Sequence, residues 1–215
     1  MKKILMLVIL PVFLFGCAGI PVRPALQENI GVSPGKVEGN RFTGIRYSFN
    51  VSVPSPWVLT AEFPDFLEQM GYDRPFSTDK EQTEFYAYHP ETKSHMDIDF
   101  TPAGRYFRCD QKRIEFITDS VTKNFISDLE KERGKGLANI QVGPTVPFSL
   151  KGIPYAAKKG VTYTVKDLKH EQGWIYGFVE PYQLFILYTI VEKEGGKDRD
   201  DLKKILESFE FIPKK

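Results

Sequence analysis

Residues 183–192, QLFILYTIVE, are apolar at both odd and even positions between Leu184 and Val191. A strand that is apolar on both faces is covered on both sides in a folded domain, so we expect this one at the centre of a sheet. The segment before it, GWIYGFVE at 173–180, alternates as a strand does. Only the short turn EPYQ separates the two segments, which predicts that they pair antiparallel.

Further strands are predicted on both sides of this pair, because several other segments alternate or are extended between turn residues. They are RYSFNVSVPSPW (46–57), the two halves of TEFYAYHPETKSHMDIDFT (83–101), IQVGPTVPFSLKG (140–152), KGVTYTVK (159–166) and FEFIP (209–213). In the first of them Tyr47 and Phe49 point one way, and Pro54 ends the strand because it cannot donate to a strand ladder.

Three segments have helical periodicity: a short one at 63–71, a long one at 110–133 and one that begins at Asp198, which we expect to cap it. In the long segment we expect one apolar stripe to face the core, made of Ile114, Ile117, Val121, Phe125 and Leu129. Strands and helices together predict an α+β fold. We expect a single domain over residues 41–215, with a mixed, mostly antiparallel sheet and flanking helices.

Three segments resemble the PsbP-like family, the extrinsic subunits of photosystem II and their bacterial relatives. They are YSFNVSVPSPW (47–57), LKGIPYAAKK (150–159) and DLKKILESFEFI (201–212). The resemblance covers most of residues 45–213 and lies in pattern and element order, without a catalytic signature. It implies a PsbP-like fold and an accessory or assembly role, and it does not by itself give the function.

The first sixteen residues are typical of a secretory signal peptide, with Lys2 and Lys3 followed by an uncharged run from Ile4 to Phe15. This run is shorter than the roughly 20 apolar residues that a membrane span needs. We therefore predict that residues 1–16 are removed.

The segment Leu14-Phe15-Gly16-Cys17 resembles the bacterial lipobox, although a small residue is commoner at the position of Phe15. The resemblance implies that Cys17 carries a lipid and becomes the new amino terminus. Two or three acyl chains make a stable anchor, whereas one alone binds reversibly. Ala18 follows the cysteine where an inner-membrane retention signal usually has Asp, which favours the outer membrane in a Gram-negative host.

Residues 17–40 are rich in Pro and Gly without an apolar period, so we predict a lipidated flexible tether. Loss of residues 1–16 removes two lysines and no acidic residue, which lowers the net charge from +1 to −1. Proteins that bind nucleic acid carry a strongly basic face. We therefore expect that the protein binds no nucleic acid. The predicted lipid anchor gives the membrane as one partner, and we expect an unknown envelope protein as the other.

Two groups of residues are candidates for chemistry. His95, Asp97 and Asp99 share one face of a predicted strand, which we expect to be the solvated face; the alternative is a cation site. Cys109 is the one thiol left after acylation of Cys17, and we expect a half-buried structural residue; the alternative is a reactive thiol beside the cationic segment RYFRCDQKR (105–113).

The aromatic residues near the carboxyl end are a further feature. Core packing is the first interpretation for them, and a ligand groove the second; the group contains Trp174, Tyr176, Phe178, Tyr182, Phe185 and Tyr188. The chain has no nucleophile elbow, phosphate loop or dinucleotide fingerprint, so we expect no catalytic residue, metal or cofactor. The leading hypothesis is a non-enzymatic envelope lipoprotein; a metal- or apolar-ligand-binding module and, less favoured, a thiol enzyme are the alternatives.

Overall fold

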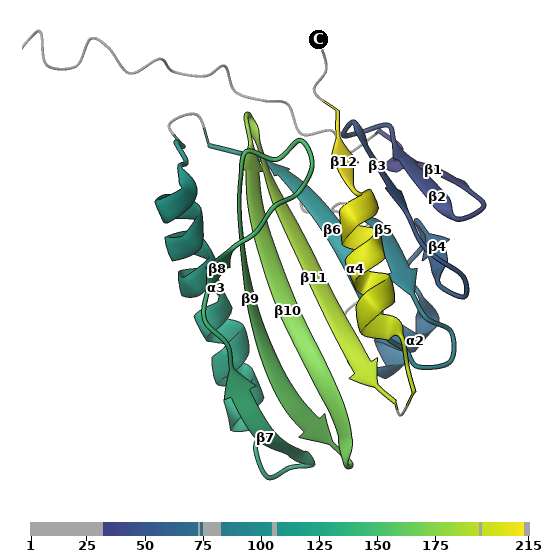
Figure 1. The fold of residues 1–215 in the computed structure, drawn as a ribbon, viewed down its shortest axis with the longest axis vertical. Helices are drawn as coiled ribbons and strands as arrows, with labels where there is room; N and C mark the ends of the chain where they lie inside the picture. Colours follow the sequence, from purple (N-terminus) through teal and green to yellow (C-terminus); the bar gives the residue numbers. More distant parts are fainter. Residues whose placement is uncertain (1–31, 73, 75–82, 105–106, 194, 213–215) are drawn as a thin grey trace, which may run out of the picture. The chain divides into compact units, whose positions relative to one another are not determined.

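The structure is a computed structural model that describes residues 32–72, 74, 83–104, 107–193 and 195–212. Residues 32–103 and 109–212 belong to one compact unit. Its strands form two antiparallel sheets (Figure 1). The small sheet has the order β1 (Gly35–Glu38), β2 (Arg41–Gly44), β3 (Phe49–Ser52) and β12 (Glu210–Phe211).

The large sheet has eight strands, and the helices α2 (Asp65–Gln69), α3 (Gln111–Lys131) and α4 (Asp198–Ser208) pack with the strands. Its order is β4 (Val58–Thr60), β5 (Thr83–Tyr88), β6 (His95–Pro102), β11 (Tyr182–Glu192), β10 (Leu168–Val179), β9 (Tyr155–Val165) and β7 (Leu137–Val142), and β8 (Val146–Pro147) also pairs with β9. The predicted α+β class with a mostly antiparallel sheet is confirmed. The division of the strands into two sheets was not predicted.

The predicted central strand is β11, which lies between β10 and β6. Its pairing with β10 is antiparallel, with Val179 opposite Tyr182 next to the turn. Leu184 and Ile186 on one face are fully buried, and Phe185 and Leu187 on the other are half-buried. Both faces of the strand are therefore covered, as its sequence predicts.

The two faces of the large sheet have different cores. On the α4 face, Leu202, Ile205 and Leu206 of the helix join one apolar cluster with Met96 and Ile186 of the sheet. On the α3 face, a smaller cluster gathers around three buried residues and is completed by partly buried helix and strand side chains; the buried residues are Val161, Tyr163 and Trp174. Figure 1 shows the two helices next to different strands, α3 beside β9 and α4 beside β11.

The buried stripe of α3 differs from the predicted one. Only Ile114 of the expected apolar stripe is buried, while Val121 and Phe125 are about 39% and 40% exposed. Thr118 and Thr122 are buried instead, because each donates its hydroxyl to the carbonyl four residues earlier at 2.7 Å. A helix can bury threonine at low cost in this way. Of the predicted stripe, Leu129 packs against the α3-face cluster and Phe125 stacks on Trp174.

The prediction that Asp198 caps α4 is wrong. The residue before it, Lys197, occupies the N-cap position, and no side chain caps the helix. The Asp198 carboxylate instead accepts hydrogen bonds from Ser94 Oγ at 2.6 Å and from the Thr92 hydroxyl. It therefore fixes the start of α4 to the turn between β5 and β6.

The folded part begins before residue 41. β1 lies within residues 17–40, which we predict as a tether, and it pairs with β2 across the turn at Gly39, where φ is +60°. Phe42 of β2 is fully buried, so this hairpin contributes to the core. The predicted cleavage site, Cys17 and the first part of the tether lie outside the described residues.

Candidate functional site

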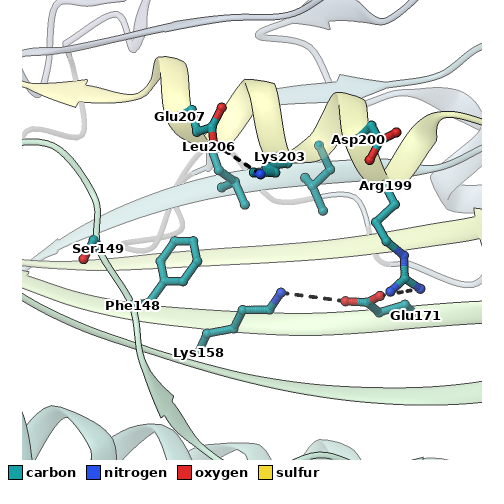
Figure 2. A pocket seen from close by; sticks show the side chains of 10 residues that line it. Phe148, Ser149, Lys158, Glu171, Arg199, Asp200, Lys203, Leu206 and Glu207 are labelled. Carbon is teal, nitrogen blue, oxygen red and sulfur yellow. Dashed lines mark ion pairs between the residues drawn. The ribbon is translucent and has the colours of Figure 1, made fainter.

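A cavity of about 460 Å³ lies between α4 and the large sheet. Sites of this volume are in the range that holds small ligands or short segments of a partner. Its sheet side is formed by Lys158 of β9 and Glu171 of β10, and Phe148 lies at one end (Figure 2). Leu202 and Leu206 of α4 form its apolar wall. We call this cavity the α4 groove.

Small residues in the sheet make room for the ring of Tyr188, which lies beneath Lys158 of the α4 groove. Gly173 lies opposite Gly160 on β9 and opposite Tyr188 on β11. A Cβ atom on Gly173 would lie 2.1 Å from the ring of Tyr188, which is itself fully buried. The glycine is therefore required for the ring to cross β10, where the Tyr188 hydroxyl donates to Glu171 Oε1 at 3.0 Å.

Glu171 is the centre of an ion network in the α4 groove. Arg199 Nη2 of α4 lies 2.8 Å from Glu171 Oε2, and Lys158 Nζ lies 3.7 Å from Oε1. Figure 2 shows Lys158 reaching the carboxylate along the sheet and Arg199 reaching it from the helix. The ring of Tyr188 lies under Lys158, with 5.0 Å between the ring centre and Lys158 Nζ.

Cations outnumber carboxylates in this network. Arg199 also pairs with Glu192, which Lys169 approaches at 3.1 Å, so three cations share two carboxylates. Burial lowers the pKa of Lys158, and the nearby Arg199 lowers it further, while Glu171 acts in the opposite direction. A second anion beside Lys158 would relieve this repulsion. The groove as a whole is lined by three cations and three carboxylates, so an added negative group would be favoured at Lys158 in particular.

A second cavity lies next to Glu171. It has a volume of about 320 Å³ and shares Glu171 with the first, and its other lining includes Gly143, Gly160 and Thr162. Glu171 is therefore accessible from both cavities.

The prediction of a solvated face for His95, Asp97 and Asp99 is wrong. His95 is only 2% exposed, and the two aspartates are half-buried. Phe66 of α2 and Tyr72 each contact the His95 ring edge-on, at 5.8 and 5.6 Å between ring centres. Burial raises the pKa of Asp97 well above its usual value, and Asp99 raises it further. Within the described ranges, no three such residues are placed to hold a metal ion.

Cys109 is half-buried just before α3, as expected. Burial raises the pKa of its thiol, and the neighbouring Asp110 raises it further. A reactive cysteine needs a lowered pKa, so the raised pKa of Cys109 disfavours the alternative of a reactive thiol. Cys17, the predicted lipidation site, lies outside the described residues.

The aromatic group is divided between the two faces of the large sheet. Trp174 and Tyr188 are fully buried and Phe178 nearly so, which agrees with the interpretation as core. Tyr176 and Phe185 remain half-buried on the α3 face, with ring centres 4.7 Å apart. Tyr188 does not line the α4 groove itself but lies beneath its lining residue Lys158 and donates to its lining residue Glu171.

The charged residues of the α4 groove were not found from the sequence. Lys158, Glu171 and Arg199 belong to β9, β10 and α4, and each has the charged character of an ordinary surface position. The one local signal is Gly173, a glycine inside a strand, which often marks a close approach of another group.

No helix in the described part of the chain is both long and apolar enough to cross a membrane.

Comparisons with known proteins give similarity of fold alone. No protein-family model matches the chain, and no curated protein matches it. Among solved structures, the crystal structure of LpqN, involved in cell envelope biogenesis of Mycobacterium tuberculosis, has a TM-score of 0.50 and 13% identity, covering 77% of this chain and 84% of LpqN. The solution structure of cyanobacterial PsbP (CyanoP) from Synechocystis has a TM-score of 0.49 and 7% identity, covering 87% of this chain and 98% of CyanoP. Membership of the PsbP-like family stays a prediction, and the α+β fold is shared with LpqN.

Proposed function

We propose that this protein is a non-enzymatic accessory factor of the cell envelope, anchored through acylated Cys17, and that the α4 groove binds an acidic, partly apolar segment of a partner protein. The observation that carries the proposal is the position of Lys158, a partly buried lysine in a groove whose other charged lining residues are Arg199, Lys203, Glu171, Asp200 and Glu207. Lys158 lies on the sheet side of the groove and shares the carboxylate of Glu171 with Arg199. Leu202 and Leu206 line the opposite wall. An acidic side chain flanked by apolar ones matches both features.

Two further observations support this role. The fold neighbour LpqN is described as involved in cell envelope biogenesis, and the amino-terminal sequence is typical of a lipoprotein. The raised pKa of the Cys109 thiol makes binding a better account than thiol catalysis. Outer-membrane attachment is the location that Ala18 favours.

The groove can be tested with a defined pair of peptides. One labelled peptide carries glutamates among leucines and phenylalanines, and the other has glutamine at the same positions. The full anchored chain in lipid nanodiscs should bind the acidic peptide about tenfold more tightly, because a charge-assisted hydrogen bond contributes about 1.5–3 kcal/mol. Lys158→Met should remove this preference, as measured by fluorescence anisotropy against empty nanodiscs.

Lys123→Met is the matched control for this experiment. Lys123 lies on α3, its side chain is 69% exposed, and it does not line the α4 groove. The proposal fails if the two peptides bind equally to the native chain, or if Lys123→Met weakens binding as much as Lys158→Met does.

The anchor has a separate test. Cells grown with labelled palmitate should incorporate the label into the native chain, and Cys17→Ser should abolish incorporation almost completely, because the acyl chains are attached through this residue. Cys109→Ser keeps the predicted acceptor and should retain the label. Label that persists in Cys17→Ser would contradict lipidation at this residue.

A further inference from the structure

A cluster of polar side chains lies on the α3 face of the large sheet, away from the α4 groove. His95 of β6 is directly opposite Thr189 of β11, and Asp97 is the next residue of β6 on the same face. Tyr72 lies beside them, close enough to Thr189 and Asp97 for both to affect the pKa of its phenol. We call these four residues the His95 cluster.

Two atoms of the His95 cluster are buried without a hydrogen-bond partner in the described part of the chain. They are His95 Nε2 and Thr189 Oγ1, and each residue is only 2% exposed. The Tyr72 phenol is near Thr189 but makes no hydrogen bond of normal geometry with it. A buried polar atom left unpaired costs about 1–3 kcal/mol, and native structures contain few of them. Two at directly opposite positions indicate a group that bonds to both.

The protonation of the cluster defines the chemistry of that group. His95 Nδ1 lies 2.9 Å from the Lys93 carbonyl oxygen, so Nδ1 carries the proton and Nε2 is an acceptor. Burial lowers the pKa of His95, which disfavours the charged form of its ring, and burial raises the pKa of Asp97, which disfavours the charged form of its carboxyl group. The hydroxyl of Thr189 both donates and accepts. A neutral group that donates and accepts fits here, whereas an ion would lack a countercharge.

A partly exposed apolar surface adjoins the cluster. Leu187 is directly opposite Asp97, and Trp174 is directly opposite Leu187 on β10. Phe125 of α3 stacks on Trp174, with ring centres 5.7 Å apart, and is about 40% exposed. Phe185 lies one step further along β11, opposite Asp99, and is half-buried. Apolar surroundings with a few convergent polar groups are typical of small-molecule sites.

We infer that the His95 cluster binds a small neutral molecule, whose hydroxyl or amide group bonds to His95 Nε2 and Thr189 Oγ1 and whose hydrocarbon part lies against Leu187 and Phe185. This site does not depend on the proposed function, because the α4 groove is on the opposite face of the sheet and is built from other residues.

Three probes of equal chain length distinguish the chemistry: hexanamide, hexanoate and hexylammonium. The full anchored chain in nanodiscs, labelled with ¹⁵N-histidine, reports binding through the Nε2 resonance of His95, with empty nanodiscs as the blank. Hexanamide should shift this resonance and bind at least tenfold more tightly than either ion. Thr189→Val should weaken hexanamide binding at least fivefold and raise the thermal stability of the ligand-free chain, because it removes a buried unpaired hydroxyl.

Thr162→Val is the control, since Thr162 lies on the α4 face of β9 and should leave hexanamide binding unchanged. The inference is overturned if an ion binds as tightly as the amide, or if Thr189→Val leaves the affinity unchanged. It is also overturned if the Nε2 resonance already shows a hydrogen bond to water that hexanamide does not alter.

Discussion

Gly173→Ala should lower the free energy of unfolding by about 3 kcal/mol, at the upper end of the range for overpacked cores. The added methyl group would lie 2.1 Å from the Cζ and hydroxyl oxygen of Tyr188. The ring is fully buried, so it cannot move aside without displacing other core side chains. The change should also separate the Tyr188 hydroxyl from Glu171. Urea unfolding of the native chain and the variant measures the difference.

Gly160→Ala is the matched control for this prediction. Gly160 is the direct cross-strand neighbour of Gly173 on β9, yet its nearest neighbours would lie 3.5 and 3.9 Å from an added Cβ, which is ordinary contact. We expect a change within about 0.5 kcal/mol, as for substitutions without a steric conflict. Equal losses of stability in the two variants would show that the flat position of Tyr188 is not what requires Gly173.

The stability of the protein should fall as the pH rises from about 5 to 8, because of Glu84. This residue is fully buried, and burial raises its pKa to about 8, with a further rise from Asp99 that Arg46 opposes. Arg46 Nε lies 3.5 Å from Oε1. The folded state therefore holds a proton that the unfolded state loses near pH 4.5. The unfolded state then binds fewer protons, and stability falls by up to about 1.4 kcal/mol per pH unit in this window.

Glu84→Gln should remove most of this dependence. The amide has nearly the same shape and cannot ionise, so the variant should match the native chain at pH 5 and exceed its free energy of unfolding by about 3–5 kcal/mol at pH 8. Urea unfolding at pH 5, 6, 7 and 8 measures both curves, and the exposed residue Glu62 supplies a control, Glu62→Gln. Parallel curves for the native chain and Glu84→Gln would contradict an uncharged Glu84 in the fold.

The central part of the large sheet was predictable because its information is local. Apolar residues on both faces of 183–192 and the short turn before them are sufficient to place β11 beside β10. Which distant strands pair is not local information. Phe49 of β3 lies opposite Phe211 of β12, and no pattern in either segment indicates that they form a second sheet.

Most of the candidate site residues could not be predicted from the sequence, for a related reason. Alternation correctly separates His95 and Asp97 from Met96 and Ile98, but it cannot show that Phe66 and Tyr72 cover the polar face. Whether a polar face is wet depends on elements elsewhere in the chain. The ion network around Glu171 likewise assembles residues from three elements.

The closure of the small sheet by β12 has a consequence for biosynthesis. Ser208, at the end of α4, donates its hydroxyl to the Ser52 carbonyl at 2.9 Å and accepts from the Ser52 amide at 2.9 Å. These residues are 156 positions apart. At a synthesis rate of about 5–20 residues per second, β3 exists for roughly 10–30 s before its partner has been made. Throughout that time the strand has an unpaired edge that could associate with another chain. The nascent chain therefore has its greatest need of a holding chaperone in this interval.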